Sequence, residues 1–303
     1  MLNRYQFEVL KYIEEKNSIK NNINDLVNNV KISRKTLEKE ILALRKSKLI
    51  EFLEENQVLS ITSAGLDALE PYRVKRAVIM GAGFGSRMMP ATKDRPKPMV
   101  TVNGKRIIET LLDAMVAVGI NDITIVRGYQ KEKYDELLEK YPFLNLVDND
   151  EYAQTNNISS VMKVLDKIDG GIYLCEADLY ITNPKVITKY QYVSNILGSY
   201  SLETDDWSFR IKDGHIIDYQ QGNTYCYNYY GISYWTPEDC VKLRQDWGKI
   251  YATDKGKDVF WEIVPLKLCK ENYKVEVREC KKSDIIEIDN YYELAALDKK
   301  YTI

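Results

Sequence analysis

Across residues 1–72, apolar positions recur at the three- to four-residue spacing of amphipathic α-helices. Phe7, Leu10 and Ile13 share one face of a predicted helix that ends at Glu15. A short second helix follows, and Ser33 is the predicted N-cap of a third. The pattern therefore predicts a small helical region at the start of the chain.

The pattern then changes twice. Residues 51–53 and 58–62 are rich in β-forming side chains and predict a hairpin, and residues 64–69 predict a last short helix. Beyond Pro71-Tyr72, short apolar strands alternate with amphipathic helices. We therefore place a domain boundary near residue 73, with one domain over residues 1–72 and a second over residues 73–303.

The second domain has the alternation of a doubly wound, mostly parallel α/β sheet of Rossmann-like architecture. Its first strand is a continuous apolar run, as in a sheet that is buried on both faces. Helices are predicted over 107–118 and from about residue 156. The predicted strands are 76–80, 122–126, 144–147, 172–178 and 285–290.

A glycine-rich loop follows the first strand directly. Glycine allows the backbone to turn tightly and approach a ligand, and a helix or turn after it would aim N–H groups at an anion. The loop lacks the dinucleotide-binding spacing, because Ser86 stands at the sixth position. A Walker loop is also excluded, since no Gly-Lys-Ser/Thr follows.

The residues after the loop make the motif specific. Segment 81–99 contains Arg87, and it contains Lys97 between two prolines. It resembles the signature of nucleotidyltransferases, which join a nucleoside triphosphate to a phosphorylated small molecule. The resemblance implies that Arg87 and Lys97 stabilise the charge that develops during attack on the α-phosphorus. It assigns the triphosphate to the loop residues Ala82, Gly83, Gly85, Ser86 and Arg87.

Two acidic residues stand near the ends of separate predicted strands, at the edge where such sheets bind ligands. The resemblance assigns Asp178 and Asp289 as ligands of one Mg²⁺, a cation that prefers oxygen donors. Capping of the final helix is the alternative for Asp289. The resemblance also places Asn157 and Ser160 near the nucleotide base, with helix N-capping as the alternative for Asn157.

The order of the later segments is similar to that of bacterial CTP:phosphocholine cytidylyltransferases. The similarity covers residues 75–298 and includes stretches 149–157, 231–235 and 258–262. It implies that CTP and phosphocholine give CDP-choline and pyrophosphate. A choline head has no N–H, so aromatic faces and negative charge must recognise it. The residues that we expect to bind the substrate are Trp207, Asp258, Trp261, Glu262 and Glu287.

The implied mechanism needs no histidine. A phosphomonoester has a second pKa near 6 and is mostly dianionic at pH 7, so its oxygen attacks without a general base. The single histidine, His215, flanks a predicted hairpin turn at Lys212-Asp213-Gly214. Cations and a carboxylate-bound Mg²⁺ therefore suffice, with pyrophosphate leaving in line.

Two alternatives remain open. The acceptor could be 2-aminoethylphosphonate or phosphoethanolamine, whose primary ammonium would use hydrogen bonds to carboxylates more than an aromatic cage. A protein of another class, a DNA-binding regulator that senses such metabolites, is the second. A sugar 1-phosphate is less favoured, because residues 180–235 look too short for a large sugar site.

The regulator alternative comes from the first domain, which resembles the winged helix-turn-helix modules of bacterial regulators. The helix after Ser33 would then be the recognition helix. Residues 1–72 hold 11 basic and 11 acidic residues, and the predicted wing over 51–55 is acidic, so a role in dimerisation or docking is the alternative. The side chains that could meet phosphates are Arg34, Lys35, Lys39, Arg45, Lys46 and Lys48.

Composition limits the remaining classes. The 303 residues carry a net charge of -2, which argues against binding to nucleic acid through overall positive charge. Five widely spaced cysteines without a Cys-x-x-Cys pair indicate reduced thiols. Without a secretory signal or a spanning apolar run, we expect a soluble, cytoplasmic enzyme. Its expected partners are CTP and a small phosphorylated amine, with no membrane; DNA and a second copy of the chain remain open.

Overall fold

The computed structural model describes residues 1–20, 23–53 and 58–302, and it divides into two compact units. Unit 1 consists of Met1–Arg73 together with the segment Tyr190–Tyr192. Unit 2 consists of Val74–Lys189 and Val193–Ile303. Glu54 and Glu55, on which the prediction of an acidic wing partly rests, lie outside the described residues.

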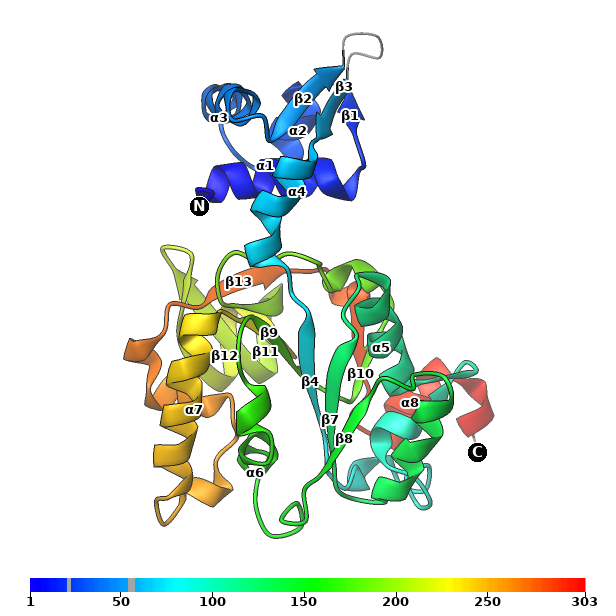
Figure 1. Ribbon diagram of the computed structural model, residues 1–303. Coiled ribbons are helices and arrows are strands. Elements are labelled where there is room, and N and C mark those ends of the chain that lie inside the picture. Colours follow the sequence, from blue (N-terminus) through cyan, green and yellow to red (C-terminus); the bar gives the residue numbers. More distant parts are fainter. Residues whose placement is uncertain (21–22, 54–57, 303) are drawn as a thin grey trace. The chain divides into compact units, whose positions relative to one another are not determined.

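Unit 1 is built from helices and a three-stranded sheet in the order β1-β3-β2 (Figure 1). The Ser33 hydroxyl accepts a hydrogen bond from the N–H of Thr36 at 3.2 Å, as an N-cap does. The helices are α1 (Arg4–Glu15), α2 (Ile23–Val30), α3 (Arg34–Lys46) and α4 (Ser63–Leu69). The strands are β1 (Ile19–Lys20), β2 (Ile50–Leu53) and β3 (Val58–Ile61).

The core of unit 1 includes a segment from far along the chain. Phe7, Leu10 and Ile13 are buried together, as their spacing predicts. The ring of Tyr192 stacks on that of Tyr72 at a centroid distance of 5.3 Å and lies 5.2 Å from Phe7. Its hydroxyl donates to the carbonyl of Leu2 at 3.2 Å. The helical periodicity of residues 1–72 gives no sign of this returning segment.

Unit 2 is centred on a seven-stranded sheet in the order β11-β13-β12-β9-β4-β7-β8. Strands β9, β4, β7 and β8 run parallel, whereas β12 is antiparallel to β9. The predicted mostly parallel α/β sheet is therefore confirmed. The strands are β4 (Arg76–Gly81), β7 (Asp122–Arg127), β8 (Asn145–Asp148), β9 (Ile172–Glu176), β11 (Asn195–Lys212), β12 (His215–Trp235) and β13 (Glu276–Glu279).

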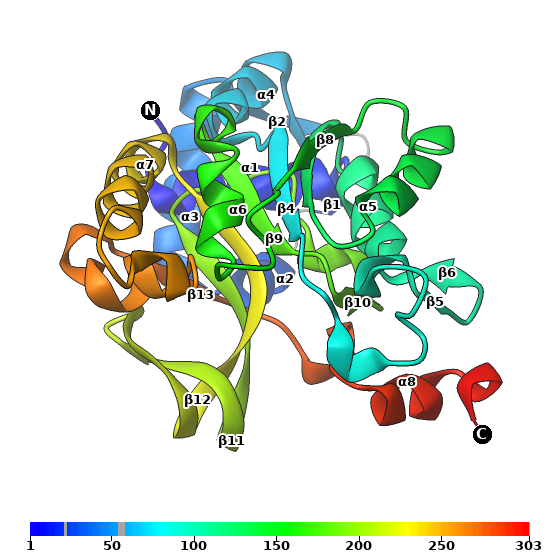
Figure 2. The same cartoon turned by 90° about the horizontal axis from the view of Figure 1, so that it is seen from below.

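Alternate residues of the central strands enter two separate cores. Ala77 and Ile79 of β4 pack on one face of the sheet, and Val78 and Met80 pack on the other. Helix α5 covers the first face, while α6 and α7 cover the second (Figures 1 and 2). The helices of unit 2 are α5 (Ile107–Ala117), α6 (Ile158–Met162), α7 (Pro237–Tyr251) and α8 (Tyr291–Leu297).

Two predicted strands are shorter than expected. The one predicted over 172–178 ends at Glu176, and the one predicted over 285–290 ends at Glu287, so both metal-ligand candidates lie just beyond strand ends. Two small sheets pair β5 with β6 and β10 with β14. Their strands are β5 (Thr101–Val102), β6 (Lys105–Arg106), β10 (Leu179–Ile181) and β14 (Ile285–Glu287).

The β11–β12 hairpin confirms the turn predicted at Lys212-Asp213-Gly214, but the length of its two strands was not predicted (Figure 2). Asp213 and Gly214 form its turn, both with positive φ, and His215 follows as the first residue of β12.

None of the helices in the described part of the chain has both the length and the apolarity that crossing a bilayer requires.

Replacing Tyr192 with alanine is expected to loosen unit 1, because the ring of Tyr192 covers Phe7 and Tyr72. A loss of about 2 kcal/mol would speed hydrogen exchange of the buried α1 amides roughly 30-fold. Tyr225→Ala, which removes an exposed ring in unit 2, is the control and should leave α1 unchanged. Unaltered α1 exchange in Tyr192→Ala would show that this segment adds nothing to the core.

Candidate active site

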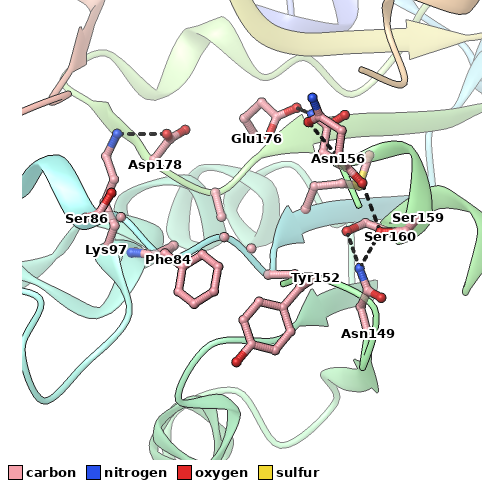
Figure 3. Close-up of a pocket in the computed structure, with 18 of the residues that line it drawn as sticks. Phe84, Ser86, Lys97, Asn149, Tyr152, Asn156, Ser159, Ser160, Glu176 and Asp178 are labelled. Atoms are coloured by element: carbon pink, nitrogen blue, oxygen red, sulfur yellow. Dashed lines mark hydrogen bonds and ion pairs between the residues drawn. The ribbon is translucent and has the colours of Figure 1, made fainter. Parts of the chain in front are cut away.

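A pocket of about 390 Å³ lies at the carboxyl ends of β4 and β9 (Figure 3). The glycine-rich loop after β4 forms one wall, and Asn157 and Ser160 belong to another. Asp178 and Asp289 also line it, as do Arg87 and Lys97. The structure therefore brings the four predicted catalytic residues to one place, together with the predicted loop residues Ala82, Gly83, Gly85 and Ser86.

Backbone conformation in the loop positions Lys97. Gly85 has φ +60°, and a Cβ added there would lie 2.7 Å from the Cβ of Lys97. The Thr92 hydroxyl donates to the Gly85 carbonyl at 3.0 Å and ties the loop to the segment that leads to Lys97. Glycine is needed at this position because it tolerates the left-handed conformation and leaves room for the lysine.

Lys97 joins the two predicted metal ligands. Its Nζ lies 2.8 Å from Asp178 Oδ2 and 3.1 Å from Asp289 Oδ1. Burial opposes the charge of Lys97, but the two carboxylates outweigh this and raise its pKa above the ordinary lysine value. Burial likewise opposes the charge of Asp178, yet Lys97 holds the pKa of Asp178 below its usual range. Lys97 and Asp178 are therefore both charged at neutral pH.

Arg87 completes the charged group from the open side. Its guanidinium donates to Asp289 Oδ1 at 3.0 Å, while its side chain stays largely exposed. The Asp289 carboxylate is thus bound to two cations rather than capping the last helix. Asn290 is the N-cap of α8, since its side chain accepts from the N–H of Glu293 at 3.0 Å.

The carboxylates of Asp178 and Asp289 suit a hard divalent cation, because such ions prefer oxygen ligands and their positive charge is opposite to that of the carboxylates. Asp178 and Asp289 share one ammonium, so their oxygens are close enough to share an ion. Carboxylate oxygens of Asp206, Glu287 and Asp289 also lie within 4.8 Å of one another. Asp289 belongs to both groups, and Asp206 is a candidate ligand that the sequence analysis did not name.

On the opposite wall, amide and hydroxyl groups form a network. Asn149 Nδ2 donates to the hydroxyls of Ser159 and Ser160 at 2.8 and 3.2 Å (Figure 3). The Asn157 side chain accepts from the backbone N–H of Trp261 at 2.8 Å and donates to Glu176 at 3.4 Å. The Asn157 side chain makes no capping bond to α6, so the N-capping alternative does not describe it.

Two rings stand at the mouth of the pocket. Phe84 and Tyr152 have centroids 5.1 Å apart, and the Phe84 side chain is partly exposed (Figure 3). A flat heterocycle could lie against these rings, since offset aromatic contacts are favourable. Tyr152 and Asn149 belong to a stretch that carried the family resemblance, but their residue types alone did not indicate a role.

The five predicted substrate residues differ in burial and in their position relative to the pocket. Trp261 is fully buried and reaches the pocket through its indole N–H, which donates to Glu176 at 2.8 Å. Glu262 is buried beside Tyr219, whereas Glu287 lies near Asp289. Trp207 stacks on Tyr219, and the Asp258 side chain is exposed and does not line the pocket.

Similarity to known proteins agrees with this geometry. The family described as Nucleotidyl transferase matches residues 76–185. A 2-aminoethylphosphonate cytidylyltransferase from Lancefieldella rimae is 36% identical over 228 residues, which cover 74% of this chain and 92% of that protein. The chain belongs to the nucleotidyl transferase family.

Further relatives place this nucleotidyltransferase beside cytidylyl-transferring enzymes. A choline-phosphate cytidylyltransferase from Streptococcus pneumoniae is 32% identical over 235 residues, covering 74% of this chain and 97% of that protein. The solved structure of the CTP:phosphocholine cytidylyltransferase from Streptococcus pneumoniae superposes with a TM-score of 0.70 at 31% identity, over 75% of this chain and 99% of that one. This chain is therefore a cytidylyltransferase-like enzyme.

Gly85→Ala should impair this nucleotidyltransferase. The added methyl group would strain the backbone and push on Lys97, so we expect kcat/KM for nucleotidyl transfer to fall about 100-fold, the cost of misplacing a reacting group by about 1 Å. The control is Gly248→Ala, because a Cβ at Gly248 meets nothing within 4 Å. Equal rates in the two variants would contradict a positioning role for Gly85.

Proposed function

We propose that this enzyme transfers a cytidylyl group from CTP to a phosphoryl oxygen of a small phosphorylated or phosphonylated amine. The observation that carries the proposal is the Lys97 ammonium held between Asp178 and Asp289 beside the glycine-rich loop. A triphosphate needs such a combination of backbone N–H groups, fixed cations and carboxylates that can hold a metal. The names of the two relatives support cytidine as the base.

The proposed reaction is an in-line substitution. An oxygen of the acceptor dianion forms a bond to the α-phosphorus of CTP, and the bond from that phosphorus to the bridging oxygen breaks. Pyrophosphate leaves with the bonding electrons, so no proton transfer is needed at the start. Arg87 and Lys97 stabilise the negative charge that spreads over the transferring group.

A divalent metal fits this scheme. Asp178 and Asp289 would hold Mg²⁺, which would supply Lewis-acid stabilisation of the phosphate charge. The protein's own contribution is to keep Asp178 ionised through Lys97. It also keeps Asp178 and Asp289 on one side of the pocket, where the strands β9 and β14 end.

The acceptor is proposed to carry a positive charge. Both named relatives act, by their names, on compounds with an amino or trimethylammonium group. Acidic side chains gather near Asp178. Burial and the charges of Glu262 and Asp178 raise the pKa of Glu176, and burial and the charges of Asp178 and Asp289 raise that of Glu287. Phosphocholine, the acceptor that we expected first, and 2-aminoethylphosphonate both meet this requirement.

Asp178→Asn and Asp289→Asn should each lower kcat/KM by about 100-fold or more, because each removes a charge that binds Lys97 and would bind the metal. Pyrophosphate release with CTP and the amine acceptors measures this. Asp254→Asn, on an exposed loop, is the matched control and should keep the parent rate. If both variants turn over CTP at the parent rate, the proposed site is wrong.

A second function, DNA binding by unit 1, is favoured by the outer face of α3. Lys35, Lys39 and Lys46 are exposed there. The acidic residues of the helix do not offset them, because Glu38 pairs with Arg34 at 2.9 Å and Glu40 is buried. A three-residue connection between α2 and α3 also matches a helix-turn-helix. We therefore propose α3 as the helix that would contact phosphates.

Lys35→Ala combined with Lys39→Ala should weaken binding to duplex DNA and reduce the slope of log affinity against log salt by about 2, one for each lost phosphate contact. Gel shifts or anisotropy with upstream DNA would measure it. Lys281→Ala with Lys282→Ala, which removes two charges from unit 2, is the control. Absence of binding at low salt would leave unit 1 with a structural role.

A further inference from the structure

Three polar side chains form a group next to the reacting residues; we call Glu176, Glu262 and Tyr229 the acceptor cluster. Glu176 is the last residue of β9 and lines the pocket, two positions before Asp178. The Tyr219 hydroxyl donates to Glu262 Oε1 at 3.4 Å, and the ring of Tyr219 meets that of Tyr229 at a centroid distance of 5.2 Å. Asn157 donates to Glu176 and accepts from the backbone N–H of Trp261, the residue before Glu262. The cluster therefore adjoins the site of the proposed chemistry.

Two atoms of the acceptor cluster have no hydrogen-bond partner. Among the described residues, Glu262 Oε2 and the Tyr229 hydroxyl are buried without one, and the Glu262 residue is only 6% exposed. Buried polar atoms are almost always satisfied in folded proteins, so an unsatisfied pair points to a ligand or a bound water. Carboxylate oxygens accept hydrogen bonds, and the missing partner must therefore be a donor.

The surroundings favour a cationic donor. Trp261 and Asn157 supply neutral N–H groups to Glu176, at 2.8 and 3.4 Å, but neither brings a positive charge. Burial raises the pKa of Glu262 to about 7, against the opposing effects of Asn157 and Tyr219. A buried carboxyl that is this close to ionising at neutral pH gains most from an ammonium.

The neighbouring rings are arranged against one another rather than as an open cage. Trp207 stacks on Tyr219 with centroids 4.8 Å apart and meets Phe260 edge-on at 6.0 Å. Tyr219 meets Tyr229 edge-on at 5.2 Å, and the Trp261 ring is fully buried. A trimethylammonium group needs several aromatic faces within about 6 Å of its charge. These rings offer few such faces, whereas the cluster offers free acceptors.

Space for the Glu176 side chain comes from the facing strand. A Cβ added at Gly231 of β12 would lie 2.2 Å from Cγ of Glu176. Tyr229 stands two positions before Gly231, so both face the same side of β12. The absence of a side chain at Gly231 thus leaves room for Glu176 beside β12.

We propose that the acceptor cluster binds the primary ammonium of the acceptor through N–H donation, so that the substrate class is a phosphonate or phosphate monoester of a small primary amine. The proposal rests on the cytidylyl transfer proposed above. Glu176 ends β9 and Asp178 follows two positions later, and both line the same pocket. A short linker between phosphorus and nitrogen would span them.

A matched series of acceptors tests the substrate class. Pyrophosphate release with CTP is compared for phosphoethanolamine and its N-methyl, N,N-dimethyl and N,N,N-trimethyl derivatives, with 2-aminoethylphosphonate alongside. We expect kcat/KM to fall with each lost N–H, to at least about 100-fold below the primary amine for phosphocholine. Equal or higher kcat/KM for phosphocholine overturns the inference and leaves the proposed function standing.

Variants test the residues. Tyr229→Phe removes only the hydroxyl, and Glu262→Gln keeps the shape of the side chain while removing its charge. Each should lower kcat/KM for phosphoethanolamine about 10-fold or more and change that for phosphocholine less. Tyr227→Phe is the control, because the Tyr227 hydroxyl donates to Glu279 away from the pocket. Unchanged discrimination in both variants would mean that a bound water satisfies the cluster, and it overturns the assignment.

Calorimetric titration of phosphoethanolamine and phosphocholine in the presence of CTP and Mg²⁺ separates the two proposals. Failure of every acceptor to release pyrophosphate would refute the cytidylyl transfer. Tighter binding of phosphoethanolamine, lost in Glu262→Gln, would still support the ammonium site in that case. Equal affinity for both compounds would contradict it.

Discussion

The ammonium of Lys97 lies between two carboxylates that would otherwise repel each other on one side of the pocket. Taking charges out of water is costly, and the cost is offset here only because cation and anions meet at hydrogen-bond distance. Arg87 binds Asp289 from outside, so the group holds two cations and two anions. The neutral balance allows four ionised groups to stand together beside a loop that presents mostly backbone.

The pairing with cations does not extend to the neighbouring glutamates. Among the described residues, no lysine or arginine lies at hydrogen-bond distance from Glu176, Glu262 or Glu287. Desolvation and the carboxylates of Asp178 and Asp289 raise the pKa of Glu287 to about 8, although its side chain is partly open to solvent. Asp178 and Asp289 are thus paired with cations, whereas the neighbouring glutamates are not. A substrate with a phosphoryl group and an ammonium would complement both groups.

A site residue could be predicted from the sequence when its partners are close to it along the chain, and not when the fold brings them together. The loop from Gly81 and the motif lysine Lys97 could be predicted because they belong to one continuous segment that follows a strand. Finding them required no knowledge of the fold. Asp178 and Asp289 were found through the resemblance, and the ends of their strands lay where such sheets bind ligands. Glu176 was missed because its role depends on Gly231, which reaches it only through pairing of β9 with β12.

The tryptophans show a second limit. Residue type indicated an aromatic wall at Trp261, but only the fold shows that its ring is buried and its N–H holds Glu176. Helical periodicity predicted α1 and α3, because the spacing of apolar residues alone identifies the buried faces of these helices. The N-terminal region could not reveal Tyr192, because a core residue contributed from more than a hundred positions away leaves no mark on local periodicity.

That returning segment has a consequence for how the chain can be cut or recombined. Unit 1 is not a contiguous stretch of sequence, since it ends at Arg73 and regains Tyr190–Tyr192. Excising the first 73 residues would strip the tripeptide of the aromatic neighbours that cover it, and grafting those residues onto another enzyme would leave Phe7 and Tyr72 bare. A transplantable version of the module must carry its own replacement for Tyr192.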